Sequence, residues 1–142
     1  MQTMTQGYDT ARAAAFFNDK LTFTTDPVEL DRLIKSGEPI TIVDVREPED
    51  FAKTHIPGAI NLPRKAWDQA AGLSRENTNV FYCYNQACHL AASACALFAG
   101  QGYQVMEMEG GFAAWNNLEL TLEHEPLNRT HRPSERLYNP RR

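Results

Sequence analysis

Apolar positions along the chain form short segments whose spacing predicts strands. Residues 39–45 form a nearly continuous apolar run, a pattern typical of a buried strand, and residues 79–83 form a second strand-like run. Shorter runs at 59–62 and 103–108 predict two more strands, and an alternation over 21–24 predicts a first one.

Helical segments lie around and between these strands. Residues 9–19 predict a helix capped by Asp9 or Thr10, and Pro27 is expected to begin the next helix, which ends at Gly37. Three further helices are predicted at 48–53, 89–99 and 112–117, and a weakly helical segment at 63–71. Because strands alternate with helices, we expect an α/β fold with a parallel sheet covered on both faces. Ligands of such sheets bind at the carboxyl ends of the strands.

Length and composition indicate one soluble domain. The chain has 142 residues, of which 42% are hydrophobic and 23% charged, so it can bury one core. No apolar run approaches the roughly 20 residues that a membrane helix needs. The first residues lack the basic start and apolar stretch of a signal peptide. We therefore expect a cytoplasmic protein that does not bind membranes.

The charges are spread unevenly. Residues 129–142 contain five Arg and one Glu, which is a local charge of +4. Since the whole chain carries −4, residues 1–128 carry −8. An acidic body argues against nucleic-acid binding, so no nucleic-acid partner is expected. We interpret the basic end as a solvated, flexible tail.

Three cysteines and four histidines are too few and too scattered for a structural metal site. No CxxC pair is present, so a zinc site is not expected. Three is also an odd number and a low one for a disulfide scaffold, so reduced thiols are the default expectation. Cys95 falls inside a predicted helix and is expected to be a core residue.

Cys83 stands out by its position. It ends the predicted strand 79–83, a polar stretch from Tyr84 to Cys88 follows, and a predicted helix begins at His89. A loop between a strand and a helix aims several backbone N–H groups at one point, and the helix dipole favours the thiolate of a cysteine placed there. The arrangement suits a sulfur nucleophile together with an anion, and so indicates sulfur or phosphoryl chemistry.

Four blocks of residues, in this order, resemble the rhodanese-like domain family. They are Asp44-Val45-Arg46-Glu47, the run from His55 to Pro63, Tyr82-Cys83, and the run from Glu109 through Gly110-Gly111-Phe112 to Trp115. The resemblance covers residues 21–118. It implies a five-stranded, mostly parallel sheet with helices on both faces. It divides the chain into an N-terminal helical extension (1–20), a rhodanese-like domain (21–122) and a basic tail (123–142).

The resemblance also implies an activity. Cys83 matches the cysteine that takes sulfane sulfur from thiosulfate or a similar small anion as a persulfide. The sulfur then passes to cyanide or to a thiol, which could belong to a protein. No metal or organic cofactor is implied. Backbone N–H groups of the active loop would stabilise the charged sulfur; the loop residues are Tyr84, Asn85, Gln86, Ala87, Cys88 and His89.

One departure from the family pattern lies in this loop. Family members carry an Arg a few residues after the cysteine, whereas only His89 is basic here. A dianion that lacks an Arg partner loses a bidentate, charge-assisted contact. We therefore expect a sulfurtransferase of low efficiency with thiosulfate and no phosphatase activity.

Several interpretations stay open at this point. Cys88 is either a small residue packed at the helix start or a resolving thiol for Cys83. The chain could accordingly be a Cys83/Cys88 redox switch, or a non-catalytic interaction module that kept the fold. Asp44 and Arg46 are expected to form an ion pair that organises the loops near Cys83. Gly110 and Gly111 predict a tight turn that needs special backbone angles.

Overall fold

The structure, a computed structural model, describes residues 7–126. Its five strands are all parallel and pair in the order β1-β5-β4-β2-β3. The strands are β1 (Thr24–Thr25), β2 (Ile40–Asp44), β3 (Ile60–Asn61), β4 (Thr78–Tyr82) and β5 (Val105–Met108). The register pairs Asp44 of β2 with Tyr82 of β4. The two strands therefore end at the same edge, which brings the residues that follow them together.

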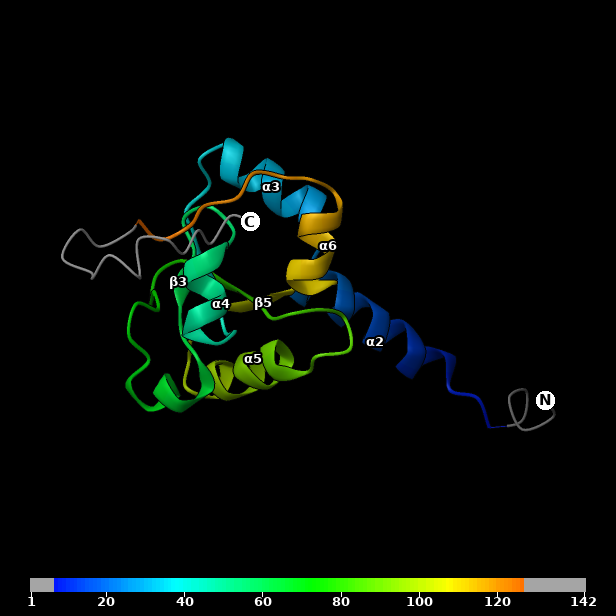
Figure 1. The fold of residues 1–142 in the computed structure, drawn as a ribbon. Coiled ribbons are helices and arrows are strands. Elements are labelled where there is room, and N and C mark those ends of the chain that lie inside the picture. Colours follow the sequence, from blue (N-terminus) through cyan, green and yellow to red (C-terminus); the bar gives the residue numbers. More distant parts are fainter. Residues whose placement is uncertain (1–6, 127–142) are drawn as a thin grey trace.

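Helices cover both faces of the sheet (Figure 1). They are α2 (Thr10–Phe23), α3 (Pro27–Lys35), α4 (Pro48–Lys53), the 3₁₀ helix η1 (Arg64–Gln69), α5 (Leu90–Gly100) and α6 (Gly111–Asn117). Figure 1 shows α5 on one side of the sheet and α3 and α6 on the other. No helix among residues 7–126 is long and apolar enough to cross a membrane.

The central strand β4 contributes side chains to the apolar clusters on both faces of the sheet. Val80 and Tyr82 pack in one apolar cluster with residues of α3 and α6, whereas Phe81 and Cys83 pack in the other, with residues of α5 and η1. Successive side chains of a strand point to opposite faces, so a strand covered on both sides must be apolar throughout. This is why the apolar run from Val80 to Cys83 is continuous rather than alternating.

The N-terminal helix is longer than the sequence predicted. The strand expected at 21–24 is wrong, because α2 continues to Phe23 and β1 contains only Thr24 and Thr25. A four-residue alternation also fits the end of a helix. Here the Thr22 hydroxyl donates back to the Asn18 carbonyl at 2.9 Å, a bond within a helical turn. The short apolar pattern carried too little information to separate the two structures.

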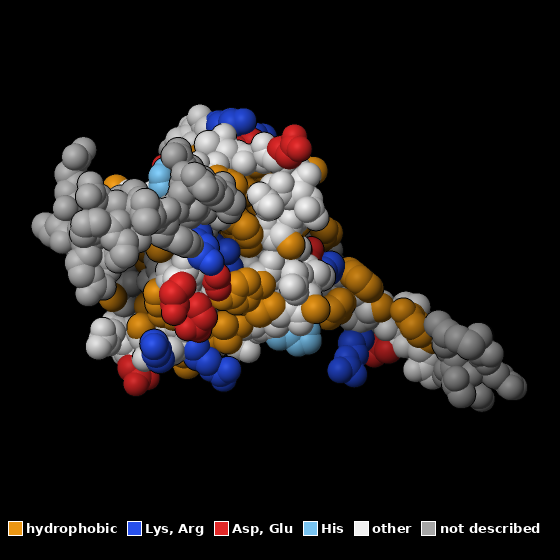
Figure 2. Space-filling view, viewed as in Figure 1, with side chains coloured by type: hydrophobic (Ala, Val, Ile, Leu, Met, Phe, Trp, Pro, Cys, Tyr) orange, Lys and Arg blue, Asp and Glu red, His pale blue; other side chains and the backbone are white. Residues whose placement is uncertain are grey.

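Helix α2 projects from the body and buries none of its residues (Figure 1). Phe16, Phe17 and Leu21 are all exposed, and apolar side chains are visible along this helix (Figure 2). Lys20 forms an ion pair with Glu109, which fixes the end of α2 next to β5. The expected boundary between residues 20 and 21 falls inside this helix, and the division into domains stays a prediction.

The chain after α6 returns to the body. The backbones of His55 and Glu123 exchange two hydrogen bonds, of 2.8 and 2.9 Å, and the Glu125 N–H donates to the Ala52 carbonyl at 3.0 Å. The part of the predicted basic tail from residue 127 onward lies outside the described residues.

Candidate active site

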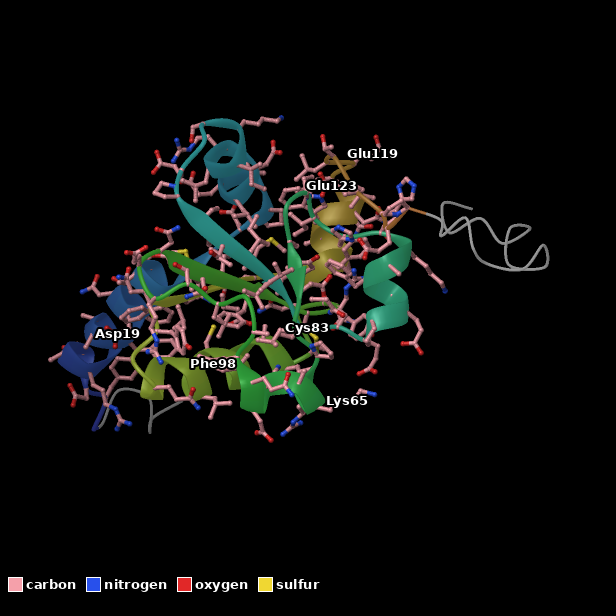
Figure 3. All side chains as sticks on the ribbon, turned by 90° about the vertical axis from the view of Figure 1, so that its left-hand side faces the viewer. Asp19, Lys65, Cys83, Phe98, Glu119 and Glu123 are labelled. Atoms are coloured by element: carbon pink, nitrogen blue, oxygen red, sulfur yellow. A yellow bond between two sulfur atoms is a disulfide. The ribbon has the colours of Figure 1, made fainter. Side chains whose placement is uncertain are left out.

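Cys83 directly follows β4 at the carboxyl edge of the sheet (Figure 3). Its side chain is only 2% exposed and belongs to the apolar cluster that contains Phe98 of α5 and Trp67 of η1. The next residues, up to His89, form the active loop, and α5 begins at Leu90. The strand, loop and helix thus follow one another as the sequence predicted.

The first turn of helix α6 is hydrogen-bonded to the backbone at the start of the active loop. The Phe112 N–H donates to the Cys83 carbonyl at 2.8 Å, and the Ala113 N–H donates to the Tyr84 carbonyl at 2.9 Å. These are first-turn N–H groups, which have no partner within their own helix. In a trans peptide the C=O and the following N–H point in opposite directions. The N–H groups of Tyr84 and Asn85 therefore point in the direction opposite to the bonded carbonyls.

Two glycines make this contact possible. Gly110 and Gly111 have φ of 86° and 62°, in the left-handed region that only glycine enters at low cost. A Cβ on Gly111 would lie 2.6 Å from the backbone nitrogen of Asn85. The Gly110 N–H donates to Oε1 of Gln86 at 2.6 Å, which adds a third link between loop and helix. The expected tight turn at Gly110-Gly111 is confirmed.

Asn85 shapes the middle of the loop. Its Oδ1 accepts hydrogen bonds from the N–H groups of Ala87 at 3.0 Å and Cys88 at 3.1 Å. These two N–H groups were expected to face an anion, but they are occupied by the Asn85 side chain. The N–H cradle is therefore smaller than the sequence indicated. An Asn that binds the amide two residues onward is a recognised turn signal, and could have been found from the sequence.

The loop brings two sulfur atoms together. Cys83 and Cys88 form a disulfide, with their Cα atoms 6.4 Å apart, and Cys95 is free. The expectation of three reduced thiols is thus wrong for this pair. The spacing of five residues was visible in the sequence, but the turn at Asn85 that folds Cys88 back was not.

Tyr84 connects the loop to α4. Its hydroxyl donates to Oδ2 of Asp50 at 2.5 Å and accepts from the Glu47 N–H at 3.1 Å. Burial and the hydrogen bond to Asp50 raise the pKa of Tyr84, so the phenol stays protonated and keeps its donor role. These two hydrogen bonds hold the side chain of Tyr84 against the start of α4, so that Tyr84 supports the loop.

Asp44, Arg46 and Tyr82 form a buried polar cluster at the carboxyl ends of β2 and β4. Arg46 donates from Nη2 to Oδ2 of Asp44 at 2.8 Å and from Nε at 3.1 Å, and both side chains are almost completely buried. The Tyr82 hydroxyl donates to the same Oδ2 at 2.5 Å and accepts from the Ile56 N–H at 3.1 Å. The Arg46 guanidinium also lies 4.1 Å from the centre of the Phe112 ring. The expected ion pair between Asp44 and Arg46 is confirmed.

The charges of this cluster are fixed by burial and by pairing. Burial and the Asp44 carboxylate both raise the pKa of Tyr82, so this phenol is always protonated. Burial alone would lower the pKa of Arg46, but the hydrogen bond and charge of Asp44 outweigh it and the pKa rises. Arg46 is therefore a permanent cation that is committed to Asp44 and to the Thr54 carbonyl, 2.6 Å away.

Neither histidine near the site replaces the missing Arg as an anchored cation. His89 is exposed at the N-cap of α5 and its side chain makes no capping bond. His55 is buried against the Phe51 ring, and its Nδ1 lies 2.7 Å from the Phe51 carbonyl, which is a structural role. No cluster of three or more potential metal ligands occurs among residues 7–126.

Comparison with known proteins identifies the family. The chain belongs to the rhodanese-like domain family: the sequence model of that family matches residues 26–118. The BH2092 protein of Bacillus halodurans has a solved structure that is 35% identical, with a TM-score of 0.74 over 82% of this chain and 87% of that one. A rhodanese-like domain protein of Staphylococcus aureus, 23% identical with a TM-score of 0.65, shares the fold.

Curated relatives carry several names. A sulfurtransferase of Allochromatium vinosum is 30% identical over 63% of this chain and 84% of its own length. The thiosulfate sulfurtransferase GlpE of Stutzerimonas stutzeri is 33% identical over 54% of this chain and 70% of its own length. The HTH-type transcriptional regulator Rv0324 of Mycobacterium tuberculosis is 36% identical over 67% of this chain. The present chain spans only 42% of that regulator.

The fit between α6 and the loop can be tested by substituting Gly111. Gly111→Ala should cost about 1–2 kcal/mol of unfolding free energy for its positive φ. It should cost about 1–3 kcal/mol more because the new Cβ meets the Asn85 backbone. Gly37→Ala is the matched control, since Gly37 has a φ of 75° and no atom within 4 Å of its Cβ position. Equal losses in urea unfolding would contradict the close contact.

The buried ion pair gives a second prediction. Asp44→Ala should lower the unfolding free energy by about 2–4 kcal/mol, because it leaves Arg46 buried without its partner. Glu29→Ala, which breaks an exposed pair with Arg32, should leave the unfolding midpoint nearly unchanged. Thermal or urea unfolding of both variants measures the difference. A loss for Asp44→Ala as small as that for Glu29→Ala would mean that Arg46 finds water or another partner.

The three thiols should differ in their response to pH. Burial, with a smaller contribution from the Glu107 charge, raises the pKa of Cys95 to about 12, so Cys95 remains a neutral thiol at lower pH. In the fully reduced, folded protein, iodoacetamide at about pH 8 should modify the half-buried Cys88 of the loop and leave Cys95 intact. Cys95 should react only as the pH approaches its pKa. Rapid alkylation of Cys95 near neutral pH would show that the pKa of this half-buried thiol is not raised.

Proposed function

We propose that this chain is a sulfurtransferase that carries sulfane sulfur on Cys83. The Cys83 thiolate attacks the outer sulfur of a small anionic donor such as thiosulfate, the donor S–S bond breaks, and sulfite leaves with the bonding electrons. The persulfide then passes its outer sulfur to a thiol or to cyanide, and the Cys83 thiolate is restored. No metal or organic cofactor takes part in these steps.

This proposal is supported above all by the two hydrogen bonds with which α6 fixes the loop that begins at Cys83. The carbonyls of Cys83 and Tyr84 are bonded to α6. The N–H groups of Tyr84 and Asn85 point the opposite way from these carbonyls, in a loop that leads from Cys83 to the start of α5. Oriented N–H groups and a helix N-terminus both stabilise negative charge on sulfur. A persulfide anion on Cys83 therefore has a preformed polar environment, although Ala87 and Cys88 contribute less than expected.

Relatives support the same chemistry. The Allochromatium vinosum protein is named a sulfurtransferase and the Stutzerimonas stutzeri protein a thiosulfate sulfurtransferase, and each is about one-third identical to this chain over the matched region. Cys83 can act only when the disulfide with Cys88 is reduced, because a disulfide has no free thiolate. Activity is thus expected only under reducing conditions.

Steady-state sulfur transfer tests the proposal. Reduced wild type should form thiocyanate from cyanide with thiosulfate or mercaptopyruvate as donor. Cys83→Ser should lose this activity completely, because neither of the other two thiols lies at the end of β4: Cys88 is within the loop and Cys95 is within α5. Cys95→Ser serves as the matched thiol control and should keep wild-type rates. Activity in Cys83→Ser, or its loss in Cys95→Ser, would contradict the assignment of Cys83.

The missing Arg gives a prediction about the donor. Arg46 is committed to Asp44, and His89 is the one basic residue of the loop, so the loop residues 84–89 offer thiosulfate no anchored cation. One lost charge-assisted contact weakens binding by roughly 1.5–3 kcal/mol, or about ten- to a hundredfold. The KM for thiosulfate should therefore be high, and phosphatase activity with p-nitrophenyl phosphate should be absent. Saturation by micromolar thiosulfate would mean that the loop obtains a cation from elsewhere.

A further inference from the structure

The disulfide shows that the folded loop lets Cys88 reach one particular atom, Sγ of Cys83. The two Cα atoms are 6.4 Å apart, within the range that a disulfide spans. Asn85 holds this geometry, since its Oδ1 accepts from the Cys88 N–H and its own carbonyl lies 3.1 Å from the same nitrogen. Cys88 is therefore held in place by the turn and needs no unfolding of the domain to reach Cys83.

The two partners of this disulfide differ in exposure. Cys83 is buried, whereas Cys88 is half-buried and the loop residues just before it, from Asn85 to Ala87, are exposed. A reductant in solution can therefore approach the disulfide from the Cys88 side. Cys95 is half-buried as well, but it lies within α5, it is unpaired, and burial disfavours its thiolate. Among the three cysteines, Cys88 alone combines access to solvent with a bond to Cys83.

We propose that Cys88 is the resolving thiol of the Cys83 persulfide and releases its sulfur as sulfide. This inference rests on the sulfurtransferase function proposed above. The Cys88 thiolate attacks Sγ of Cys83, the bond between Sγ and the outer sulfur breaks, and hydrosulfide leaves with the bonding electrons. The Cys83–Cys88 disulfide remains. The two cysteines are oxidised and the sulfane sulfur is reduced to sulfide. The hydrosulfide keeps the proton of the outer sulfur of the persulfide, and it takes up the proton that Cys88 lost on forming its thiolate to give H₂S.

Attack on the inner sulfur follows from the geometry. The bond in the structure joins Cys88 to Sγ of Cys83, which is the inner sulfur of the persulfide. Thiolates displace a leaving group from sulfur in line, so the outer sulfur would project from the far side of Sγ. Cys88 is therefore placed to expel the outer sulfur rather than to receive it.

The cycle needs one further reactant, a dithiol reductant. A protein or small-molecule dithiol would reduce the Cys83–Cys88 disulfide by thiol–disulfide exchange and would itself become oxidised. Both cysteines are then thiols again, and Cys83 can accept another sulfur. The overall reaction converts thiosulfate and a dithiol into sulfite, sulfide and a disulfide. The state seen in this structure is the intermediate that follows sulfide release.

A single-turnover experiment separates this step from sulfur loading. Reduced protein, freed of reductant and kept anaerobic, is loaded with thiosulfate and, in parallel, with glutathione persulfide, which does not depend on an anion site. Intact mass and released sulfide are followed with no acceptor present. Wild type should first gain one sulfur, then lose it together with two hydrogens, and release one sulfide per chain. Cys95→Ser, the matched control, should behave in the same way.

Cys88→Ser should gain one sulfur and keep it, with sulfide release lost. Peptide mapping should place the sulfur on Cys83, and cyanide should remove it as thiocyanate, which identifies it as sulfane sulfur. Sulfide release from Cys88→Ser at the wild-type rate would overturn the resolving role while leaving the sulfurtransferase function intact. So would extra sulfur found on Cys88 of the wild type, which indicates a relay. If neither donor adds sulfur to Cys83 in any variant, the proposed function fails, and the resolving role fails with it.

Discussion

The site depends on the contact between the first turn of α6 and the active loop. The active loop has no regular secondary structure that would fix its conformation. The N–H groups of Phe112 and Ala113 fix it by donating hydrogen bonds to its first two peptide groups after Cys83. The contact requires backbone against backbone, because a Cβ at Gly111 would lie 2.6 Å from the Asn85 nitrogen. The pair of glycines is thus a geometric requirement of the site.

Phe112 also joins this contact to the buried polar cluster. Its N–H binds the Cys83 carbonyl, and its ring lies over the Arg46 guanidinium, which is paired with Asp44. Tyr82, the residue before Cys83, donates to the same Asp44 carboxylate. Cys83 follows Tyr82 in the chain and is hydrogen-bonded to Phe112, and the positions of both residues depend on one buried charge pair. An Arg used in this way supports the loop and is not available to a substrate.

The fold was largely predictable because its signals are local and repeated. The continuous apolar run at 80–83, Pro27 after a capping Asp26, and Gly110-Gly111 each specify a structure through nearby residues. The strand expected at 21–24 failed for the same reason, since four alternating residues also fit the end of a helix. Sequence patterns predict best where several residues support the same structure.

The candidate site was less predictable because its contacts join residues far apart in the chain. Cys83 could be chosen from its place between a strand and a helix. The bonds from Gly110 to Gln86 and from Tyr84 to Asp50 depend on how α6 and α4 pack, which no local pattern encodes. The Cys83–Cys88 disulfide depends on a turn within the loop, so the spacing left its formation open.

A crystal structure of the reduced protein soaked with thiosulfate would test the central claim most directly, because it locates the transferred atom. The account predicts one additional atom bonded to Sγ of Cys83 in Cys88→Ser, where no second thiol can remove it. The N–H groups of Tyr84 and Asn85 should face that atom, and α6 should keep its hydrogen bonds to the loop. An unmodified Cys83 in reduced, soaked crystals of Cys88→Ser, with sulfur on another residue or on none, would contradict the account.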